Sequence, residues 1–298
     1  MTTAANRPFG RLITAMVTPF HLDGTLDIPG AQRLATYLVD DQHNDALVIN
    51  GTTGESPTTS NEEKENLLRA VVDAVGDRAK IIAGVGTFDT QHTVELARTA
   101  EKAGANGLLV VSPYYSKPPQ TGLLRHFTTV ADASELPILL YDIPHRTGTT
   151  LQTDTIIKLA EHPRIVGMKD AKGDLVATSW VLQRSDLAYY SGDDALTLPM
   201  LAVGGVGLVG TSTHLSGVGT KAMIESFERG DHAEALRRHR QLLPIFTGIF
   251  RTQGCILVKA AMNARGLPAG PVRSPLVDAT GEELAALRAD CVAADIDL

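Results

Sequence analysis

The sequence predicts an α/β fold, a (β/α)8 TIM barrel with a C-terminal helical extension, and three observations lead to this prediction. Eight short apolar runs recur along the chain, segments with helical periodicity separate them, and only helical segments follow the eighth run. A doubly wound open sheet gives a similar alternation, so periodicity alone does not separate the two folds. The count of eight favours the barrel. The first run is also not followed by a Gly-x-Gly-x-x-Gly motif, which disfavours a dinucleotide-binding sheet.

The apolar runs have the length of buried strands and lie between turn-forming residues. Their length is too short for a helix of ordinary size. The predicted strands are residues 12–17, 46–50, 81–85, 107–111, 137–141, 165–169, 187–191 and 206–210.

Helical segments separate these strands, and their starts carry capping residues. Ser60 and Glu63 form a capped start after the second strand, and apolar residues then recur on one face until Gly76 ends the helix. Thr90 caps a helix after the third strand. After the eighth strand the helices lie at about residues 221–229, 233–251, 255–265 and 282–294. We therefore expect residues 1–229 to form the barrel and residues 230–298 the helical extension.

The composition argues against several classes of function. The 298-residue chain has a net charge of −7 and mixes acidic and basic residues without a basic cluster, so nucleic acid is not an expected partner. Cys255 and Cys291 are far apart and lack metal ligands nearby in sequence. This pattern predicts reduced thiols, no zinc site and a cytoplasmic location.

Neither a secretory signal nor a membrane span is expected. Residues 1–11 lack the apolar stretch of a secretory signal. Residues 195–220 carry no charge, but Pro199, six glycines and a Thr/Ser/His run make them only weakly apolar. We interpret this segment as the start of a buried helix, a strand and a glycine-rich loop that includes His214.

The sixth strand ends on Lys169, at the edge of the sheet where ligands bind in α/β proteins. An amine in a poorly solvated pocket shifts toward its neutral, nucleophilic form, which makes Lys169 a candidate for Schiff-base formation. The alternative is a solvated lysine that only marks the end of the strand. Lys172 is the nearest rival, and because it follows on the loop we expect it to be solvated.

Further polar motifs follow other strands, and each has two interpretations. Thr52 and Thr53, with a glycine on either side, suit a carboxylate or phosphate, but they equally suit a polar turn before a helix. Tyr115 and the tyrosine before it are either packing residues or proton carriers. Asp193 and Asp194 are adjacent carboxylates, and we favour a helix cap over a metal site because neighbouring side chains seldom converge on one ion.

The fifth strand leads into a tyrosine and an arginine. Tyr141 shares a face with Leu139 by period two, so its phenol points into the barrel if Leu139 does, where it could move protons. Arg146 could bind a carboxylate through two parallel hydrogen bonds, or it could form a surface ion pair.

Together these motifs resemble the 4-hydroxy-tetrahydrodipicolinate synthase family, also called dihydrodipicolinate synthase, of the pyruvate-dependent Schiff-base aldolases. The resemblance runs in one register from about residue 10 to the carboxyl end. Five ordered motifs at consistent spacing are more specific than any one of them. They are Thr52-Thr53 within Gly51 to Ser56, Tyr114-Tyr115, Tyr141-Asp142-Ile143-Pro144-x-Arg146-Thr147-Gly148, Val166-Gly167-Met168-Lys169-Asp170 and Ser191-Gly192-Asp193-Asp194.

The resemblance implies a lyase that is usually a homotetramer, a dimer of dimers, and that uses no metal and no organic cofactor. In such an enzyme Lys169 condenses with pyruvate to a Schiff base. The resulting enamine attacks the aldehyde of L-aspartate 4-semialdehyde, the first committed step of lysine and diaminopimelate biosynthesis. The resemblance makes Tyr141 the acid/base phenol, linked through the Thr52 hydroxyl to Tyr115 of a neighbouring subunit.

The resemblance also implies which residues bind the substrates. Thr53 and the amides near it would hold the pyruvate carboxylate. Gly192 and the backbone carbonyl of Val209 would line the pocket near Lys169, and Arg146 would bind the carboxylate of the aldehyde substrate.

The chain departs from the family pattern at positions that concern the second substrate and regulation. His145 replaces a residue that is usually small, and Gly210 replaces a residue that is usually serine. Positions of the family's inhibitor site that are often His, His, Asn and Glu are here Asn61, Lys64, Phe88 and His92. A fixed Lys64 would repel a cationic effector, so we expect feedback inhibition by lysine to be weak or absent.

Other functions remain open from the sequence. A sialic acid lyase or a keto-deoxy sugar acid aldolase would share Lys169, but its polyol substrate would need neutral hydroxyl partners where Arg146 lies. A non-catalytic barrel that binds a small acid would keep Thr52, Thr53 and Arg146 without an activated lysine. A phosphate-binding barrel would use the glycines at residues 204–205.

Overall fold

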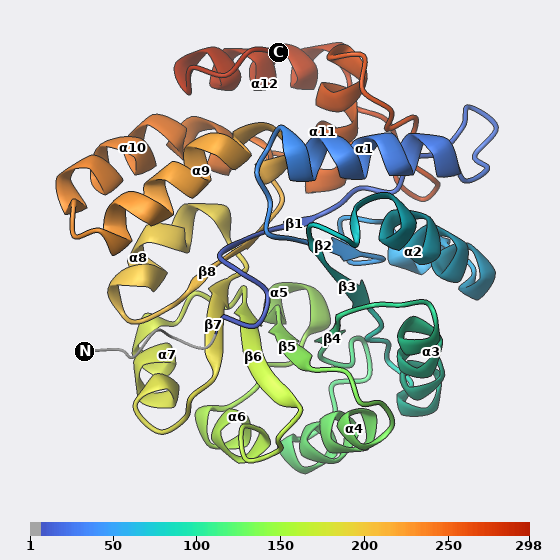
Figure 1. Ribbon diagram of the computed structural model, residues 1–298, viewed down its shortest axis with the longest axis vertical. Coiled ribbons are helices and arrows are strands. Elements are labelled where there is room, and N and C mark those ends of the chain that lie inside the picture. Colours follow the sequence, from blue (N-terminus) through green and yellow to red (C-terminus); the bar gives the residue numbers. More distant parts are fainter. Residues whose placement is uncertain (1–6) are drawn as a thin grey trace.

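The structure, a computed structural model that describes residues 7–298, is a closed barrel of eight parallel strands surrounded by helices (Figure 1). Each strand pairs with the next in chain order, and β1 closes the barrel against β8. The predicted fold and all eight predicted strands are confirmed. The strands are β1 (Leu12–Ala15), β2 (Ala46–Ile49), β3 (Lys80–Gly84), β4 (Gly107–Val111), β5 (Ile138–Asp142), β6 (Ile165–Asp170), β7 (Ala188–Ser191) and β8 (Gly207–Gly210).

Helices cover the outside of the barrel. The capping box predicted at the start of α2 is present: the Glu63 N–H donates to Ser60 Oγ (3.1 Å), and the Ser60 N–H donates to the Glu63 carboxylate (2.8 Å). Thr90 begins α3, but the capping side chain is Asp89. Before the C-terminal extension the helices are α1 (Ile28–Asp40), η1 (Ser56–Thr58), α2 (Asn61–Val75), α3 (Thr90–Lys102), α4 (Gln120–Asp132), α5 (Pro144–Thr147), α6 (Thr153–Leu159), α7 (Leu175–Leu182), η2 (Asp194–Leu196), α8 (Thr197–Ala202) and α9 (Thr213–Glu228).

Two apolar clusters form the core, one inside the barrel and one between the strands and the helices. Successive side chains of a strand point to opposite faces, so each buried strand contributes to both clusters. Leu139 and Tyr141 of β5 lie in the interior cluster, as predicted, whereas Leu140 lies in the outer one. Tyr141 is the register partner of Lys169 on β6. The phenol and the amine therefore start from the same level of the barrel.

Gly167 of β6 occupies a position without room for a side chain. A Cβ atom there would lie 2.5 Å from the carbonyl oxygen of Ala188 and 2.7 Å from Cδ2 of Leu139. Both distances are shorter than van der Waals contact. The strand that carries Lys169 thus approaches its neighbours closely two residues before the lysine.

Three further helices, α10 (His232–Gly248), α11 (Gly254–Ala264) and α12 (Gly281–Ala293), form the C-terminal extension beside α1 and α9 (Figure 1). The helix predicted at residues 221–229 is the second half of α9, so His214 lies in a helix and not on a loop. The start of α9 was missed because Gly217 is a poor helix former. That glycine is needed there, since a Cβ atom would lie 2.5 Å from the Gln42 carbonyl oxygen. The boundary between residues 229 and 230 stays a prediction.

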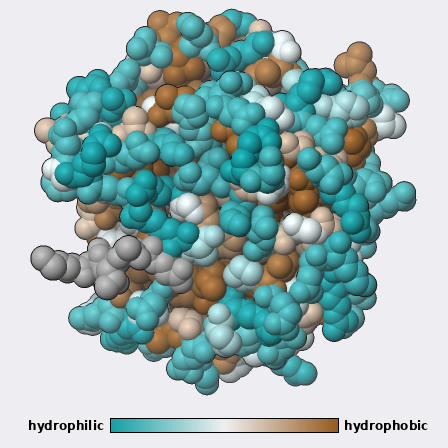
Figure 2. All heavy atoms as spheres, in the orientation of Figure 1, coloured by the Kyte–Doolittle hydropathy of each residue, from teal (hydrophilic) through white to brown (hydrophobic). Residues whose placement is uncertain are grey.

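The surface shown in Figure 2 is mostly hydrophilic, with small apolar groups between the polar side chains. Of the helices in residues 7–298, none combines the length and the apolarity that crossing a membrane requires. The uncharged segment 195–220 contains α8, β8 and the first part of α9. The secretory-signal prediction concerns residues 1–11, of which residues 1–6 lie outside the described part of the chain.

Replacing Gly167 with alanine should lower the free energy of unfolding by about 1–3 kcal/mol, because the added Cβ overlaps a backbone oxygen of β7. Chemical denaturation followed by circular dichroism measures this change. Gly281→Ala is the matched control: nothing lies within 4 Å of a Cβ atom at that position, so its stability should be equal or slightly higher. Equal stability of the two variants would contradict the close packing around β6.

Candidate active site

A cavity of about 440 Å³ opens at the carboxyl end of the barrel, where the loops after the strands meet. Its walls come from the loops after β2, β5, β6, β7 and β8, and from the end of α10 and the start of α11. Closure of the barrel thus brings together residues that are far apart in the chain. Six of the predicted site residues line this cavity: Thr52, Thr53, Tyr141, Arg146, Lys169 and Gly192.

Lys169 lies in the interior at the end of β6, with only 5% of its surface exposed. Burial lowers the pKa of the Lys169 amine to about 8, while the Asp194 carboxylate raises that pKa and the Arg146 guanidinium lowers it. Lys169 takes part in none of the ion pairs formed within residues 7–298. The alternative of a solvated lysine is therefore wrong, and the amine is neutral often enough near neutral pH to act as a nucleophile.

Tyr141 presents its ring to this amine, with Lys169 Nζ 4.3 Å from the ring centroid. Burial raises the pKa of the Tyr141 phenol to about 12, and the Arg146 guanidinium and the Thr52 side chain act in the opposite direction. The phenol keeps its proton at neutral pH and can donate it to a group that reacts beside the lysine.

The loop after β2 brings two threonines to the cavity. Two successive turns between Gly51 and Glu55, each closed by a 3.1 Å backbone hydrogen bond, shape this loop. Thr53 is buried, and its Oγ1 lies 3.2 Å from Oγ1 of Thr211 after β8. Because a hydroxyl group rotates freely, the Thr53 hydroxyl can turn from Thr211 to donate to a carboxylate in the cavity.

Arg146 extends from α5, a single turn that ends at Gly148, whose φ is 74°. The side chain is exposed at the rim of the cavity. None of the ion pairs within residues 7–298 involves Arg146, so the surface ion-pair alternative finds no partner in this part of the chain. The guanidinium can therefore offer paired N–H donors to a carboxylate, and His145 lines the cavity beside it.

Asp194 has a position that the sequence did not reveal. We expected it to cap a helix, but Asp193 is the cap, and the Asp194 carboxylate is fully buried instead. It accepts hydrogen bonds from the Thr211 N–H (3.2 Å), the Ser212 N–H (2.9 Å) and the Ser212 hydroxyl (2.5 Å). The two adjacent carboxylates thus have different partners. In residues 7–298, no three His, Cys, Asp or Glu side chains are grouped so that they could hold a metal ion.

The surroundings of Gly210 account for one departure from the family pattern. A Cβ atom at Gly210 would lie 2.8 Å from Thr213 Cγ2 and 2.9 Å from Asp194 Oδ1. A serine at this position would require Thr213 or the hydrogen-bonded Asp194 to move. In this chain the glycine therefore leaves room for the buried carboxylate that acts on Lys169.

Two predicted site residues do not line the cavity, and one expectation is wrong. Tyr115 is 92% exposed and has a left-handed φ of 72°. Val209 is buried, with its side chain in the interior cluster of the barrel. Lys172, expected to be solvated, is largely buried because a buried carboxylate attracts it: its Nζ lies 3.9 Å from Asp142 Oδ2.

The C-terminal extension supplies a wall of the cavity that the sequence did not predict. No local motif marks these residues, because they reach the site only through the packing of α10 against α9 and η2. A dipeptide or loop signature therefore could not have identified them. They are Phe246, Thr247, Phe250, Thr252, Gln253 and Gly254.

A second cavity, of about 370 Å³, shares Thr52 and Tyr141 with the first. Its lining includes all four positions that the resemblance assigns to an inhibitor site, Asn61, Lys64, Phe88 and His92. The Lys64 ammonium donates to the Thr59 carbonyl, and burial lowers the pKa of Lys64. Weak inhibition by lysine stays a prediction.

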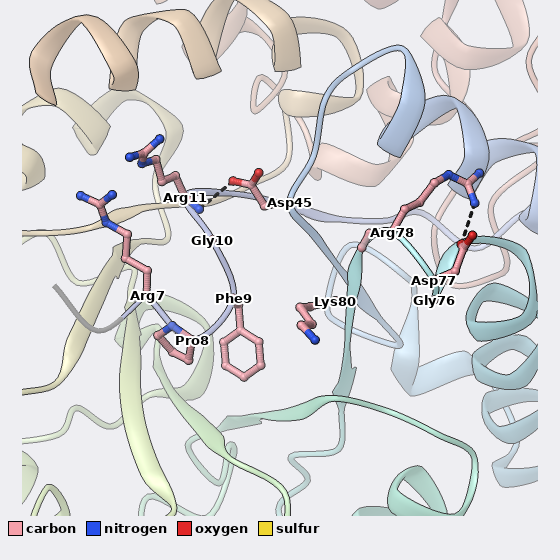
Figure 3. Close-up of a pocket in the computed structure, with 11 residues that line it drawn as sticks. Arg7, Pro8, Phe9, Gly10, Arg11, Asp45, Gly76, Asp77, Arg78 and Lys80 are labelled. Atoms are coloured by element: carbon pink, nitrogen blue, oxygen red, sulfur yellow. Dashed lines mark hydrogen bonds and ion pairs between the residues drawn. The ribbon is translucent and has the colours of Figure 1, made fainter. Parts of the chain in front are cut away.

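A third cavity, of about 490 Å³, lies at the amino end of the barrel and carries several basic side chains (Figure 3). The three arginines already have partners: Arg7 and Arg11 pair with Glu228, and Arg78 pairs with Asp77. Figure 3 shows Arg78 turned toward Asp77 and away from the two other arginines. The paired charges indicate a stabilising role for this end, so we place the candidate active site at the carboxyl end.

Comparisons with known proteins agree with this site. The model of the dihydrodipicolinate synthetase family matches residues 8–294. The 4-hydroxy-tetrahydrodipicolinate synthase of Acidothermus cellulolyticus is 67% identical over 295 residues, which are 99% of this chain and 96% of that protein. The 4-hydroxy-tetrahydrodipicolinate synthase 2 of Streptomyces coelicolor is 58% identical, over 100% of this chain and 99% of that protein.

Solved structures give the same result. The crystal structure of the synthase from Cyanidioschyzon merolae with lysine bound has a TM-score of 0.94 and 42% identity. The match covers 97% of this chain and 99% of the chain in that structure. The family resemblance seen in the motifs is confirmed, and the chain belongs to the dihydrodipicolinate synthetase family.

Proposed function

We propose that this chain condenses pyruvate with L-aspartate 4-semialdehyde to give 4-hydroxy-tetrahydrodipicolinate, through a Schiff base on Lys169. The relatives named above carry the name of this activity. The observation that supports the mechanism is the buried Lys169 amine, whose pKa lies near 8, beside a protonated phenol at the carboxyl end of the barrel. A lysine at an ordinary surface position would be almost fully protonated at neutral pH.

The first half of the reaction activates pyruvate. The neutral Lys169 amine attacks the keto carbon, and loss of water gives an imine. Tyr141 donates a proton to the departing oxygen, which suits a phenol that stays protonated at neutral pH. The imine nitrogen withdraws electrons from the methyl group. When that group loses a proton, the imine becomes an enamine. Thr53 and the backbone amides near it hold the pyruvate carboxylate, and Gly192 lines the same cavity as Lys169.

The second half joins the two substrates. The enamine carbon attacks the aldehyde, and the amine of the second substrate then displaces Lys169 as the product closes into a ring. Arg146 binds the carboxylate of the aldehyde through two hydrogen bonds, because its guanidinium has no other partner in residues 7–298. A sugar acid aldolase would need hydroxyl partners at this place, so Arg146 favours the small charged aldehyde. A binding protein would not need the buried, activated lysine.

The assembly and the location belong to the same proposal. We propose a homotetramer, a dimer of dimers, in which Tyr115 reaches the site of a neighbouring subunit and connects to Tyr141 through Thr52. The nearly complete exposure of Tyr115 within this single chain is compatible with such a role. We propose a cytoplasmic location because Cys255 and Cys291 are buried free thiols.

Incubation with pyruvate followed by borohydride reduction should attach pyruvate covalently to Lys169, because reduction makes the imine permanent. Peptide mapping by mass spectrometry locates the adduct. Lys169→Arg should abolish both the adduct and turnover, whereas Lys172→Arg, the matched control, should keep the adduct. Absence of an adduct, or an adduct on Lys172, would refute the mechanism.

The rate of adduct formation at limiting pyruvate should rise with pH and level off above about pH 8, because only the neutral Lys169 amine attacks. Asp194→Asn removes a carboxylate that raises the pKa of Lys169, so the midpoint of this profile should move to lower pH. The measurement is the trapping rate at a series of pH values. A midpoint that stays in place or moves to higher pH would contradict the electrostatic role of Asp194.

Arg146→Gln should lower kcat/KM for the aldehyde by roughly 30- to 150-fold, since loss of a charged hydrogen bond costs about 2–3 kcal/mol. Trapping of pyruvate should fall much less, only through the loss of one charge that lowers the pKa of Lys169. Steady-state kinetics with each substrate varied in turn separates the two effects, and His145→Ala serves as the neighbouring control with a smaller expected loss. An equal loss of pyruvate trapping in Arg146→Gln would contradict the assignment.

A further inference from the structure

Glu55, directly after the Thr52-Thr53 loop, has an unusual position for a glutamate. Its backbone is left-handed, with φ of 55°, a region that residues with a side chain seldom adopt. Its carboxylate is almost completely buried, with a side-chain exposure of 1%. Both features cost free energy, so the surrounding structure must hold this residue in place.

Two groups of the C-terminal extension hold the Glu55 carboxylate. Lys259 Nζ of α11 lies 2.5 Å from Oε1, and the side chain of Lys259 is only 2% exposed. The backbone N–H of Arg273 donates to Oε2 at 2.8 Å. Both groups come from more than 200 residues further along the chain. The link between the β2 loop and the extension is therefore a buried ion pair with an additional hydrogen bond.

The two cationic residues are themselves fixed. Lys259 Nζ donates to the Pro271 carbonyl at 2.7 Å and lies 4.2 Å from the ring centroid of Phe20. The Arg273 guanidinium lies 4.1 Å from the same centroid and donates to the Thr58 carbonyl at 2.7 Å. A cation over an aromatic face gains electrostatic attraction, and the hydrogen bonds further restrict the positions of the two side chains. The extension thus contacts the segment after β2 at Glu55 itself and again three residues later at Thr58.

Movement of Glu55 would be transmitted to the threonines through the backbone. The Glu55 N–H closes a turn by donating to the Thr52 carbonyl at 3.1 Å. Gly54 lies directly before Glu55 and is also held in place, because the Thr18 hydroxyl donates to its carbonyl at 2.6 Å. Thr52 and Thr53 face the active-site cavity, whereas Glu55 and Lys259 do not line it. The ion pair therefore lies behind the cradle that would hold the pyruvate carboxylate.

A contribution to stability does not by itself explain why a buried ion pair is present here. Burying two charges removes them from water, and replacement of a buried ion pair by neutral residues of similar size is often tolerated. A geometric role accounts better for a charged pair at this place, because it holds a left-handed residue two positions after Thr53.

We propose that Glu55 is a positioning residue: through its ion pair with Lys259, the C-terminal extension sets the orientation of Thr52 and Thr53 and thereby the affinity for the pyruvate carboxylate. This inference rests on the proposed function of the Thr53 loop. The reacting groups Lys169 and Tyr141 lie on β6 and β5 and do not contact the pair. Loosening the pair should therefore weaken pyruvate binding more than it slows the chemical steps.

The test replaces the pair by neutral residues of similar size in the double variant Glu55→Gln/Lys259→Met. Without an unpaired buried charge the double variant should fold, whereas each single variant should be less stable. In the double variant the KM for pyruvate should rise by roughly tenfold or more, with kcat and the KM for the aldehyde changed by less than about threefold. The pyruvate concentration that gives half-maximal borohydride trapping should rise by the same factor.

The matched control removes an ion pair at the other end of the barrel. Lys221 Nζ lies 2.8 Å from Asp45 Oδ1, and neither residue lines the active-site cavity. The double variant Lys221→Met/Asp45→Asn should keep the KM for pyruvate of the unsubstituted chain. Thermal denaturation of all variants shows whether each is folded at the assay temperature.

A folded Glu55→Gln/Lys259→Met variant with an unchanged KM for pyruvate would overturn the inference. If that variant does not fold, Glu55→Asp replaces it: the aspartate keeps the charge but is one methylene shorter, so its ion pair must pull the loop, and an unchanged KM would again overturn the inference. Trapping separates this inference from the proposed function. If the unsubstituted chain forms no pyruvate adduct, the proposed function fails; if it forms one and the trapping curve of the variant is not shifted, only the inference fails.

Discussion

Burial of the Lys169 amine at the end of β6 is the constraint on which the rest of the site depends. A lysine in the interior without an ion pair within residues 7–298 is costly, and the protein reduces that cost by lowering the pKa of the amine to about 8. Two nearby charges act on this pKa in opposite directions: the Asp194 carboxylate raises it, and the Arg146 guanidinium lowers it. The same burial keeps the Tyr141 phenol protonated, so in the proposed mechanism one desolvated pocket prepares both a nucleophile and an acid.

The barrel provides the geometry that this pocket requires. Register pairing of β5 with β6 puts Tyr141 opposite Lys169, and close packing around Gly167 holds β6 against both neighbouring strands. Loops at the carboxyl end then add the threonines, Arg146 and Asp194. The C-terminal extension is part of this site and not only an appendage, because α10 and α11 line the cavity and Lys259 of α11 pairs with Glu55 behind the β2 loop.

Local pattern was sufficient for the strands, for Lys169 at a strand end and for the inward direction of Tyr141. Each of these depends on residue type and period along a single segment. The partners of Asp194, the burial of Lys172 and the Glu55–Lys259 pair could not be predicted in this way, because each depends on which segments the closed barrel brings together. The early start of α9 was missed because Gly217 lowers helix propensity, while its close approach to Gln42 explains the glycine.

The most direct test of this account is the ionisation of Lys169 in the enzyme without substrate. The rate at which a small amine-reactive reagent modifies Lys169, followed by peptide mass spectrometry across a range of pH, reports the pKa of that amine. We predict a midpoint near 8, as expected for a buried amine at the end of β6. A midpoint at the ordinary lysine value of 10.5 would contradict the claim that the fold activates Lys169 by burial.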